Sequence, residues 1–390
     1  MPTPAIDAIA LTQALVRCPS VTPLEGGALA LLEQTLRPLG FDVHRMTFTH
    51  AGTPDVENLY ARRGDSGPNL CFAGHTDVVP SGDERRWRLP PFAAEIRDGI
   101  LVGRGAVDMK GAIACFVAAV ARLAARPGGV GGSVSLLITG DEEGPSVNGT
   151  RKVLDWLKTK GERLDACVVG EPSNPHALGD EIKIGRRGSL NAWLTVTGRQ
   201  GHVAYPHLAA NPITGIVDVL QALKAERLDE GTEHFARSNL EATTVDVGNG
   251  TVNIIPAEAK ARLNIRYNDR HTAVSLEARL SEVAARVLDG RELAHAWTFL
   301  RSGDAFLTQP GPLVETMTAA VRDVTGRTPA LTTSGGTSDA RFIKDACPVI
   351  EMGLVNATIH QVDEHVPVSD LVQLTDIYAR FIEGYFARAS

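Results

Sequence analysis

Short, mainly apolar runs alternate with helical patterns along the first half of the chain. Residues 69–73, 133–139 and 165–169 are typical of buried strands, and residues 109–125 and 150–160 between them have the spacing of helices. Two further helices are expected at residues 6–17 and 27–39. Strands that alternate with helices form a mostly parallel sheet covered by helices. This pattern predicts an α/β domain.

The pattern changes near residue 184. Residues 189–197, 241–247 and 259–267 alternate between apolar and polar side chains, as half-buried strands do, and helices are expected at 212–227 and 273–289. We therefore expect an inserted, smaller α+β domain with an antiparallel sheet over residues 184–297. The α/β rhythm resumes near Trp297, with helices at 312–324, 338–345 and 369–387 and a strand at 348–352. The α/β domain then comprises residues 1–183 and 298–390.

Composition and charge exclude several classes of protein. The 390 residues are 43% hydrophobic and 22% charged, which is typical of a globular protein of two or three domains. A net charge of −7 argues against a general nucleic-acid or anionic-membrane binder, and no apolar run reaches the ~20 residues of a membrane span. The five cysteines are scattered without a CxxC pair, so we expect no disulfide framework and a cytoplasmic location.

Polar residues follow the predicted strands of the α/β domain. GHTD (74–77) follows the first strand, GDEEG (140–144) the second and GEP (170–172) the third. Asp108 precedes the apolar helix, and His360 follows the strand near residue 350. In open α/β sheets, ligands bind at the carboxyl ends of the strands. If the strands are neighbours, two imidazoles and four carboxylates converge on one edge of the sheet.

Such a set of side chains has the chemistry of a metal site. Imidazole and carboxylate are good zinc ligands, and a two-metal site uses a bridging carboxylate. Asp77, two residues after His75, could accept the second imidazole N–H. Taken singly, GHTD is more simply a turn with a solvated histidine, and DEE is more simply a solvated acidic turn. GRGAVD suggests a nucleotide loop only superficially, because it follows no clear strand and lacks G-x-G-x-x-G.

The sequence also resembles a known family. GHTDVVPSGD (74–83), GRGAVDMKG (103–111), TGDEEGPSVNGT (139–150) and VVGEPS (168–173) resemble the consecutive signatures of the M20 family of di-zinc amidohydrolases and peptidases. Segments at 183–190, 198–213, 251–259, 334–342 and 356–366 narrow the resemblance to members that remove the succinyl group from N-succinyl-LL-2,6-diaminopimelate. The resemblance covers nearly the whole chain. Asp363 stands where the family pattern has Asn.

The resemblance implies two Zn²⁺ per subunit, which Co²⁺ can replace. Its five metal ligands are His75 and Glu171 for one ion, Glu143 and His360 for the other, and Asp108 as the bridge. Glu142 is the implied general base, and Asp77 and His202 are the other implied catalytic residues. A cis peptide is expected after Asp108.

The inserted domain carries most of the implied substrate-binding residues. The inserted domain contributes Arg186, Ser189, Tyr205, Asn253 and Arg266, and the implied set is completed by Gly335, Gly336 and Thr337 of the α/β domain. From the residues alone, Asn253 and the two arginines could equally be surface or ladder residues, and the turn at 335–337 could be an ordinary helix cap. The same turn could instead cradle a carboxylate. Gly201-His202 is by itself an ordinary turn, and the resemblance implies an oxyanion role for His202 across a homodimer.

The implied activity is hydrolysis of N-succinyl-LL-2,6-diaminopimelate to succinate and LL-2,6-diaminopimelate, in lysine and diaminopimelate biosynthesis. The substrate is a small anionic N-succinyl amino acid, and neither nucleic acid nor membrane is an expected partner. Two alternatives stay open. One is another M20 deacylase, such as an acetylornithine deacetylase, and the other is a non-catalytic M20-like protein.

Overall fold

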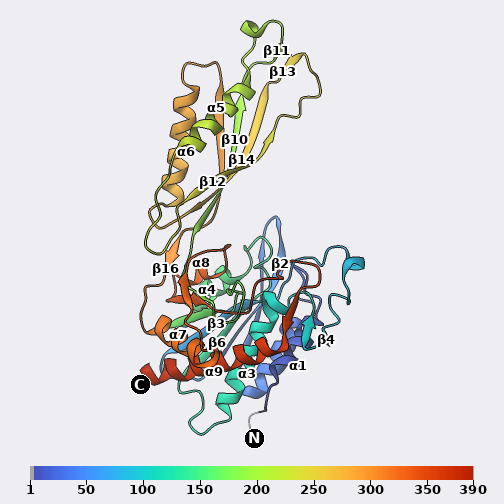
Figure 1. Cartoon of the computed structure of the whole chain (residues 1–390), viewed down its shortest axis with the longest axis vertical. Coiled ribbons are helices and arrows are strands. Elements are labelled where there is room, and N and C mark those ends of the chain that lie inside the picture. The colour runs from blue at the N-terminus through green and yellow to red at the C-terminus, as the bar shows by residue number, and fades with distance from the viewer. Residues whose placement is uncertain (1–3, 390) are drawn as a thin grey trace. The chain divides into compact units, whose positions relative to one another are not determined.

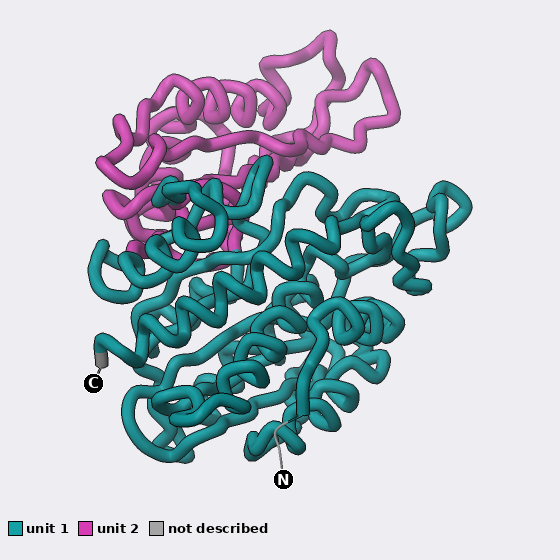
Figure 2. Tube along the Cα trace, turned by 60° about the horizontal axis from the view of Figure 1, so that its bottom comes forward, with its two compact units in different colours: residues 1–184, 308–332, 338–390 teal, residues 185–307, 333–337 magenta. Residues whose placement is uncertain are grey.

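The structure, a computed structural model, describes residues 4–389 and divides into two compact units (Figure 2). Unit 1 comprises the described residues up to Ile184, residues 308–332 and those from Ser338 onward, and unit 2 comprises residues 185–307 and 333–337. The chain is thus an α/β unit that is interrupted by an inserted second unit. Residues 1–3 and 390, which were expected to belong to the α/β domain, lie outside the described residues.

The predicted end of the insertion, residue 297, needs correction. It falls inside strand β15 (Ala294–Gly303), which pairs with β10 (Gly188–Thr197) over most of its length. The insertion therefore continues to Leu307. The apolar residues near Trp297, which suggested a return of the α/β rhythm, instead complete the smaller sheet.

Unit 1 is built on an eight-stranded sheet of order β1-β2-β6-β3-β7-β18-β8-β17 (Figure 1). Its strands are β1 (Asp42–His50), β2 (Thr53–Arg63), β3 (Asn69–His75), β6 (Ser133–Thr139), β7 (Ala166–Val169), β8 (Glu181–Lys183), β17 (Ala330–Thr332) and β18 (Val349–Glu351). The centre, β6-β3-β7-β18, is parallel, as predicted. Every residue of β3, β6 and β7 is buried, which explains why these strands read as apolar runs rather than as an alternation.

Seven α-helices accompany this sheet in the described part of unit 1. They are α1 (Ala8–Val16), α2 (Ala28–Leu36), α3 (Gly111–Ala124), α4 (Thr150–Thr159), α7 (Pro312–Thr325), α8 (Ala340–Ile343) and α9 (Val368–Ala389). Helix α3 is buried almost throughout, and it packs against α1 and α9. Phe72 of β3 stacks on Phe116 of α3 with ring centroids 4.4 Å apart, and Tyr378 of α9 meets both rings edge-on. These contacts fix the helix that follows Asp108 against the central strand.

A small three-stranded sheet of order β19-β5-β4 completes unit 1. Its strands are β4 (Glu95–Arg97), β5 (Ile100–Val102) and β19 (His365–Pro367). Strand β19 pairs antiparallel with β5, so His365 lies opposite Val102. This pairing joins the loop that precedes Asp108 to the segment that contains His360.

Unit 2 contains a four-stranded antiparallel sheet of order β12-β14-β10-β15. The remaining strands are β12 (Asn239–Asp246) and β14 (Glu258–Tyr267), with the two-residue pairs β11 (Gly201–His202) with β13 (Ile254–Ile255) and β9 (Gly185–Arg186) with β16 (Phe306–Leu307). Helices α5 (Pro212–Ala225) and α6 (Ala273–Leu288) pack together on this sheet. Alternate residues of β14 are buried, as the alternating sequence predicted.

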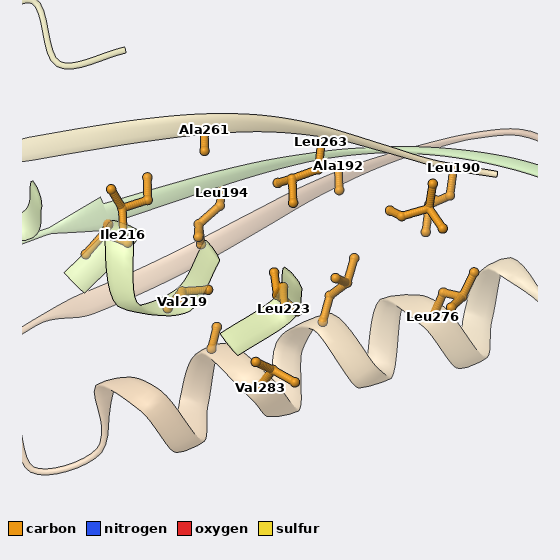
Figure 3. Close-up of a cluster of buried hydrophobic side chains, with 14 of the residues drawn as sticks. Leu190, Ala192, Leu194, Ile216, Val219, Leu223, Ala261, Leu263, Leu276 and Val283 are labelled. Atoms are coloured by element: carbon orange, nitrogen blue, oxygen red, sulfur yellow. The ribbon is translucent and has the colours of Figure 1, made fainter. Parts of the chain in front are cut away.

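The core of unit 2 lies between the sheet and its two helices (Figure 3). Leu194 of β10 and Leu263 of β14 point toward Val219 of α5 and Val283 of α6, and all four are almost fully buried. Burying one such side chain stabilises a fold by about 1.5–3 kcal/mol. The sheet of unit 2 is therefore a well-anchored platform for the residues at its two ends. Within residues 4–389, no helix has both the length and the apolar character that crossing a bilayer requires.

Candidate metal centre

Parallel strands bring three of the predicted segments to one edge of the unit 1 sheet. Strand β3 pairs with β6 on one side and with β7 on the other, so that His75 lies opposite Thr139 and Ala73 opposite Val169. His75 is the last residue of β3, while Glu142 and Glu143 follow β6 and Glu171 follows β7. The prediction of a shared site depended on these strands being adjacent in the sheet, and their adjacency is confirmed.

Asp108 reaches the same place from a break in the chain before α3. Its φ and ψ of −119° and 92° are not helical, and α3 begins three residues later at Gly111. The Asp108–Met109 peptide is cis, as the family resemblance led us to expect. His360 comes from the segment before β19 and has a φ of 60°.

The five predicted metal ligands lie together. His75 Nε2 is 3.2 Å from Asp108 Oδ1 and 3.7 Å from Glu171 Oε1. On the other side of the same carboxylate, His360 Nε2 is 3.3 Å from Asp108 Oδ2 and 2.7 Å from Glu143 Oε1. The two imidazoles thus face different oxygens of Asp108.

These contacts define two groups of donor atoms that share Asp108. His75, Asp108 and Glu171 form one group, Asp108, Glu143 and His360 form the other, and the donor atoms within each group lie within 4.8 Å of one another. Mixed nitrogen and carboxylate donors suit Zn²⁺. A third group joins His75 to Glu142 and Glu143, so geometry alone leaves open which glutamate is a ligand.

The electrostatics of the centre favour a bound cation. Burial, followed by the charges of Asp108 and Glu142, raises the pKa of Glu171 well above its usual value. Hydrogen bonds to Asp108 and Glu143 raise the pKa of His360 to about 10. The shift of Glu171 reflects carboxylates crowded in a buried place, and the shift of His360 reflects the negative charge of the two carboxylates beside it; a divalent cation would offset this negative charge. The residues present therefore fit a pair of zinc ions.

Glu142 has the surroundings of a proton acceptor and donor. Burial raises its pKa to about 8, helped by the carboxylates of Asp339, Glu143 and Asp108 and opposed by His75. A pKa near the working pH is what general acid–base catalysis requires.

Asp77 has a different role from the one expected. The second nitrogen of His75, Nδ1, is 2.8 Å from the main-chain oxygen of Asp77 and 3.7 Å from its carboxylate. The main-chain carbonyl, and not the carboxylate, therefore accepts the imidazole proton and leaves Nε2 toward Asp108. The buried carboxylate instead accepts the main-chain N–H groups of Glu142 and Glu143, at 3.3 and 3.0 Å.

Asp339 also belongs to this region, although it was not among the predicted site residues. It is buried, and its Oδ2 accepts a hydrogen bond from Thr150 Oγ1 at 2.6 Å. Both residues occur in segments that carried the family resemblance. The available signal was the carboxylate in SGGTSDARF, a segment in which only the glycine turn was predicted to act.

Asp363, the departure from the family pattern, lies near the centre without touching a predicted ligand through its side chain. It has a left-handed φ of 59°, which Asp and Asn both tolerate. Its carboxylate accepts the main-chain N–H of Arg88 at 2.8 Å. An Asn side chain would keep this acceptor, while the ion pair of Asp363 with Arg88 Nε at 3.3 Å requires the carboxylate.

The predicted substrate-binding residues lie in unit 2, where they form two clusters. At the first end of β10, Arg186 Nη1 donates to the main-chain oxygens of Ser334 and Gly336 at 3.1 and 3.3 Å, and so holds the turn that contains Gly335–Thr337. Ser189 lies opposite Arg266 across the β10–β14 pairing. We call these residues the arginine cluster: Arg186, Ser189, Arg266 and Gly335–Thr337.

The second cluster, the histidine cluster of His202, Tyr205 and Asn253, lies beyond the other end of β10. Pairing of β11 with β13 brings His202 beside Asn253, and the rings of His202 and Tyr205 are 5.7 Å apart. The main-chain N–H of Ala204 donates to His202 Nδ1 at 3.0 Å, so a neutral His202 carries its proton on Nε2. The histidine is exposed and can donate that proton to an anionic oxygen.

A parallel sheet whose strand ends gather two imidazoles and four carboxylates is the arrangement of a metal-dependent hydrolase. Residues 71–384 match the profile of the peptidase family M20/M25/M40, and the chain belongs to this family. A curated succinyl-diaminopimelate desuccinylase from Rhodospirillum centenum (strain ATCC 51521 / SW) is 58% identical over 385 residues, which cover 99% of each chain. The resemblance seen in the sequence is confirmed.

Solved structures share the fold at much lower identity. The aminopeptidase PepT from Bacillus cereus ATCC 10987 has a TM-score of 0.80 at 20% identity, with 97% of this chain and 98% of that chain covered. The M20 family metallo-carboxypeptidase Sso-CP2 from Sulfolobus solfataricus has a TM-score of 0.76 at 18% identity, with 98% and 99% covered. The α/β fold with its inserted α+β unit is therefore the fold of M20 proteins.

Proposed function

We propose that this protein hydrolyses the amide bond of N-succinyl-LL-2,6-diaminopimelate, releasing succinate and LL-2,6-diaminopimelate for lysine and diaminopimelate biosynthesis. The observation that carries the chemistry is the pair of donor groups that share Asp108, with Glu142 beside them. The substrate follows from the 58% identity to a curated desuccinylase along the whole chain.

In this proposal the centre holds two zinc ions, which Co²⁺ can replace. His75 and Glu171 would hold one ion, Glu143 and His360 would hold the other, and Asp108 would contribute one oxygen to each group. Two such ions, when bound, lower the pKa of a water molecule and polarise the amide carbonyl. The ligands contribute orientation, because the carbonyl of Asp77 fixes the tautomer of His75.

Glu142 is the proposed general base and acid. Since His360 contacts both Glu143 and Asp108, Glu143 is the better ligand, and Glu142 is left to act on water. Glu142 accepts the proton of the attacking water and then gives it to the leaving amine. The Nε2–H of His202 donates a hydrogen bond to the oxyanion that develops on the succinyl carbonyl.

The arginine cluster is the proposed carboxylate-binding site. N-succinyl-diaminopimelate carries three carboxylates and one ammonium, so it needs cationic partners. Arg186 and Arg266 supply guanidinium groups, which pair with carboxylates through two parallel hydrogen bonds. Ser189 and the turn Gly335–Thr337 add neutral donors, and Tyr205 and Asn253 contact the substrate from the histidine cluster.

The separation of the two clusters supports a homodimer. Ser189 lies near one end of β10, and His202 follows the other end, where Thr197 pairs with Glu258. Ten residues of strand span ~30 Å, which exceeds the length of the substrate. In this proposal a second copy of the chain supplies the histidine cluster that completes each site. In a two-fold dimer formed through unit 2, each chain would provide its histidine cluster to the site of the other chain.

Complementation tests the exchange of His202 between chains. His202→Ala chains and Glu142→Gln chains are each expected to be inactive. Mixed dimers should regain activity, because one of their two sites keeps Glu142 and receives an intact His202. Mixed dimers that form and stay as inactive as the parents would show that His202 acts within its own chain or not at all.

A substrate comparison tests the reaction itself. Purified, zinc-loaded protein is assayed with N-succinyl-LL-2,6-diaminopimelate and, in parallel, with N-acetylornithine. We expect a kcat/KM at least ~10²-fold higher for the succinyl substrate, because acetylornithine leaves guanidinium groups of the arginine cluster unpaired. The reverse preference would identify another M20 deacylase, and no hydrolysis of either would favour a non-catalytic protein.

A cytoplasmic location belongs to the same proposal. All five cysteines are free, and four of them are buried. A chain with unpaired thiols suits a reducing compartment.

A further inference from the structure

The Asp108 loop and the His360 segment are joined by a buried carboxylate that belongs to neither donor group. Glu364 follows His360 by four residues and directly precedes β19. Because β19 pairs with β5, Glu364 lies beside the loop that leads from β5 to Asp108. Its side chain is 1% exposed, and it does not contact a predicted ligand's donor atom.

The Glu364 carboxylate accepts four hydrogen bonds from that loop. Oε2 accepts from Arg104 Nη1 at 2.6 Å and from the main-chain N–H of Gly105 at 3.0 Å. Oε1 accepts from the main-chain N–H groups of Val107 and Asp108 at 2.9 and 3.2 Å. Each oxygen therefore has two donors, and a protonated acid would direct its O–H against one of them. Both oxygens of Glu364 therefore act as acceptors only.

Arg104 is held as firmly as its partner. Its side chain is 3% exposed, and its guanidinium lies 5.3 Å from the centre of the Trp87 ring. The main-chain N–H of Gly103 also donates to the main-chain oxygen of Glu364 at 2.8 Å. Five hydrogen bonds thus link Glu364 to residues 103–108. Two stretches of chain about 250 residues apart in sequence are fixed to each other next to the metal centre.

We infer that Glu364, with Arg104, is a positioning residue that sets Asp108 and His360 at the spacing two metal ions require. Asp108 makes contacts to both imidazoles, so a small rotation of its loop changes both donor groups together. Main-chain N–H groups that lose a buried acceptor must find another, and the loop shifts to reach it. This inference deepens the proposed metal centre and rests on it.

The test is zinc titration of the apoprotein with Glu364→Gln. The amide keeps one oxygen but turns an NH₂ group toward two donors, so one side of the loop loses its acceptors. Removing the hydrogen-bond partner of a metal ligand lowers metal affinity about 10–100-fold. We expect that loss at both ions because Asp108 belongs to both donor groups. The visible absorption of the Co²⁺ form should change as well, since it reports ligand geometry.

Glu162→Ala is the control for lost stability, because a glutamine oxygen would keep all three hydrogen bonds, which fall on Oε1 alone. Glu162 accepts hydrogen bonds from Tyr60, Arg62 and Asn69 at 3.0, 2.6 and 3.1 Å, and none of these residues is a predicted ligand. This variant is expected to lose stability while keeping the parent's zinc affinity and Co²⁺ spectrum. If Glu364→Gln does not fold, Glu364→Asp replaces it in the test. The shorter side chain keeps the charge but cannot reach all four donors, so we expect zinc affinity to fall about threefold or more at both ions.

The outcomes separate the two proposals. A parent protein that binds no zinc refutes the metal centre, and with it the role of Glu364. A parent that binds two ions beside a Glu364 variant that binds them equally tightly refutes the role of Glu364 alone. Equal losses of affinity in the Glu364 and Glu162 variants would also overturn it, because lost stability would then explain both.

Discussion

Asp77→Asn separates two ways in which the metal centre can be organised. In the structure the Asp77 carboxylate accepts the main-chain N–H groups of Glu142 and Glu143, one on each oxygen, while its main-chain carbonyl orients His75. If this is right, the substitution disturbs the loop of the two glutamates and leaves the His75 side of the centre intact. If the carboxylate instead orients the imidazole, the variant loses the His75-bound ion.

The magnitude follows from the two hydrogen bonds. Asparagine keeps one acceptor and presents an NH₂ group to the other N–H, so one buried main-chain donor loses its partner, which costs about 1–3 kcal/mol. The remaining hydrogen bond loses its charge assistance, which costs roughly 1 kcal/mol more. We expect the free energy of unfolding to fall by about 2–4 kcal/mol. A less firmly held Glu142 should lower kcat about 10–100-fold.

Asp141→Asn is the control for this experiment. Asp141 Oδ2 alone accepts the N–H groups of Val147 and Asn148, at 2.8 and 2.7 Å, so an amide oxygen in that place keeps both bonds. This variant should change the free energy of unfolding by less than about 1 kcal/mol. Urea unfolding, metal analysis and kcat are measured for both proteins. An Asp77→Asn protein that keeps its stability and lacks one zinc would refute the role of the Asp77 carboxylate in holding the glutamate loop.

Three further predictions follow from the same geometry. Glu142→Gln should abolish turnover and keep two zinc ions per chain by metal analysis, and loss of about one ion would show that the roles of Glu142 and Glu143 are exchanged. Asp108→Ala should lose both ions, whereas His360→Ala should mainly weaken one, and equal single-ion losses in zinc titration would remove Asp108 as the bridge. Replacing Gly185–Leu307 by a short glycine linker should leave a folded unit that binds zinc and has almost no turnover, because the flanking residues are already hydrogen-bonded at 2.7 Å. Substantial turnover of that protein would exclude a catalytic part for unit 2.

That the candidate ligands gather at one edge of the sheet could be predicted because parallel sheets impose a simple rule. His75, Glu143 and Glu171 each follow an apolar strand, and the carboxyl ends of neighbouring parallel strands meet. The strands were recognisable because burial on both faces makes them apolar throughout. Which strands are adjacent depends on the strand order of the sheet, and hydrophobic periodicity does not give that order. The family resemblance supplied it.

Other features left a weaker trace in the sequence. Strands β1 and β2 form a hairpin that was not predicted, because β1 lies mostly exposed and its sequence, DVHRMTFTH, lacks a clear apolar face. The role of the Asp77 carboxylate depends on main-chain N–H groups, which every residue except proline has and no sequence pattern reveals. Glu364 acts on a loop far away in sequence, and only the pairing of β19 with β5 brings the two together.

The most direct test of the metal centre is anomalous diffraction from crystals of the zinc-loaded protein, recorded on both sides of the zinc absorption edge. The proposed centre predicts two anomalous peaks ~3.5–4 Å apart, one on each side of the Asp108 carboxylate. One peak should lie beside His75 and Glu171, and the other beside Glu143 and His360. A single peak, or a pair of peaks that Asp108 does not bridge, would contradict it.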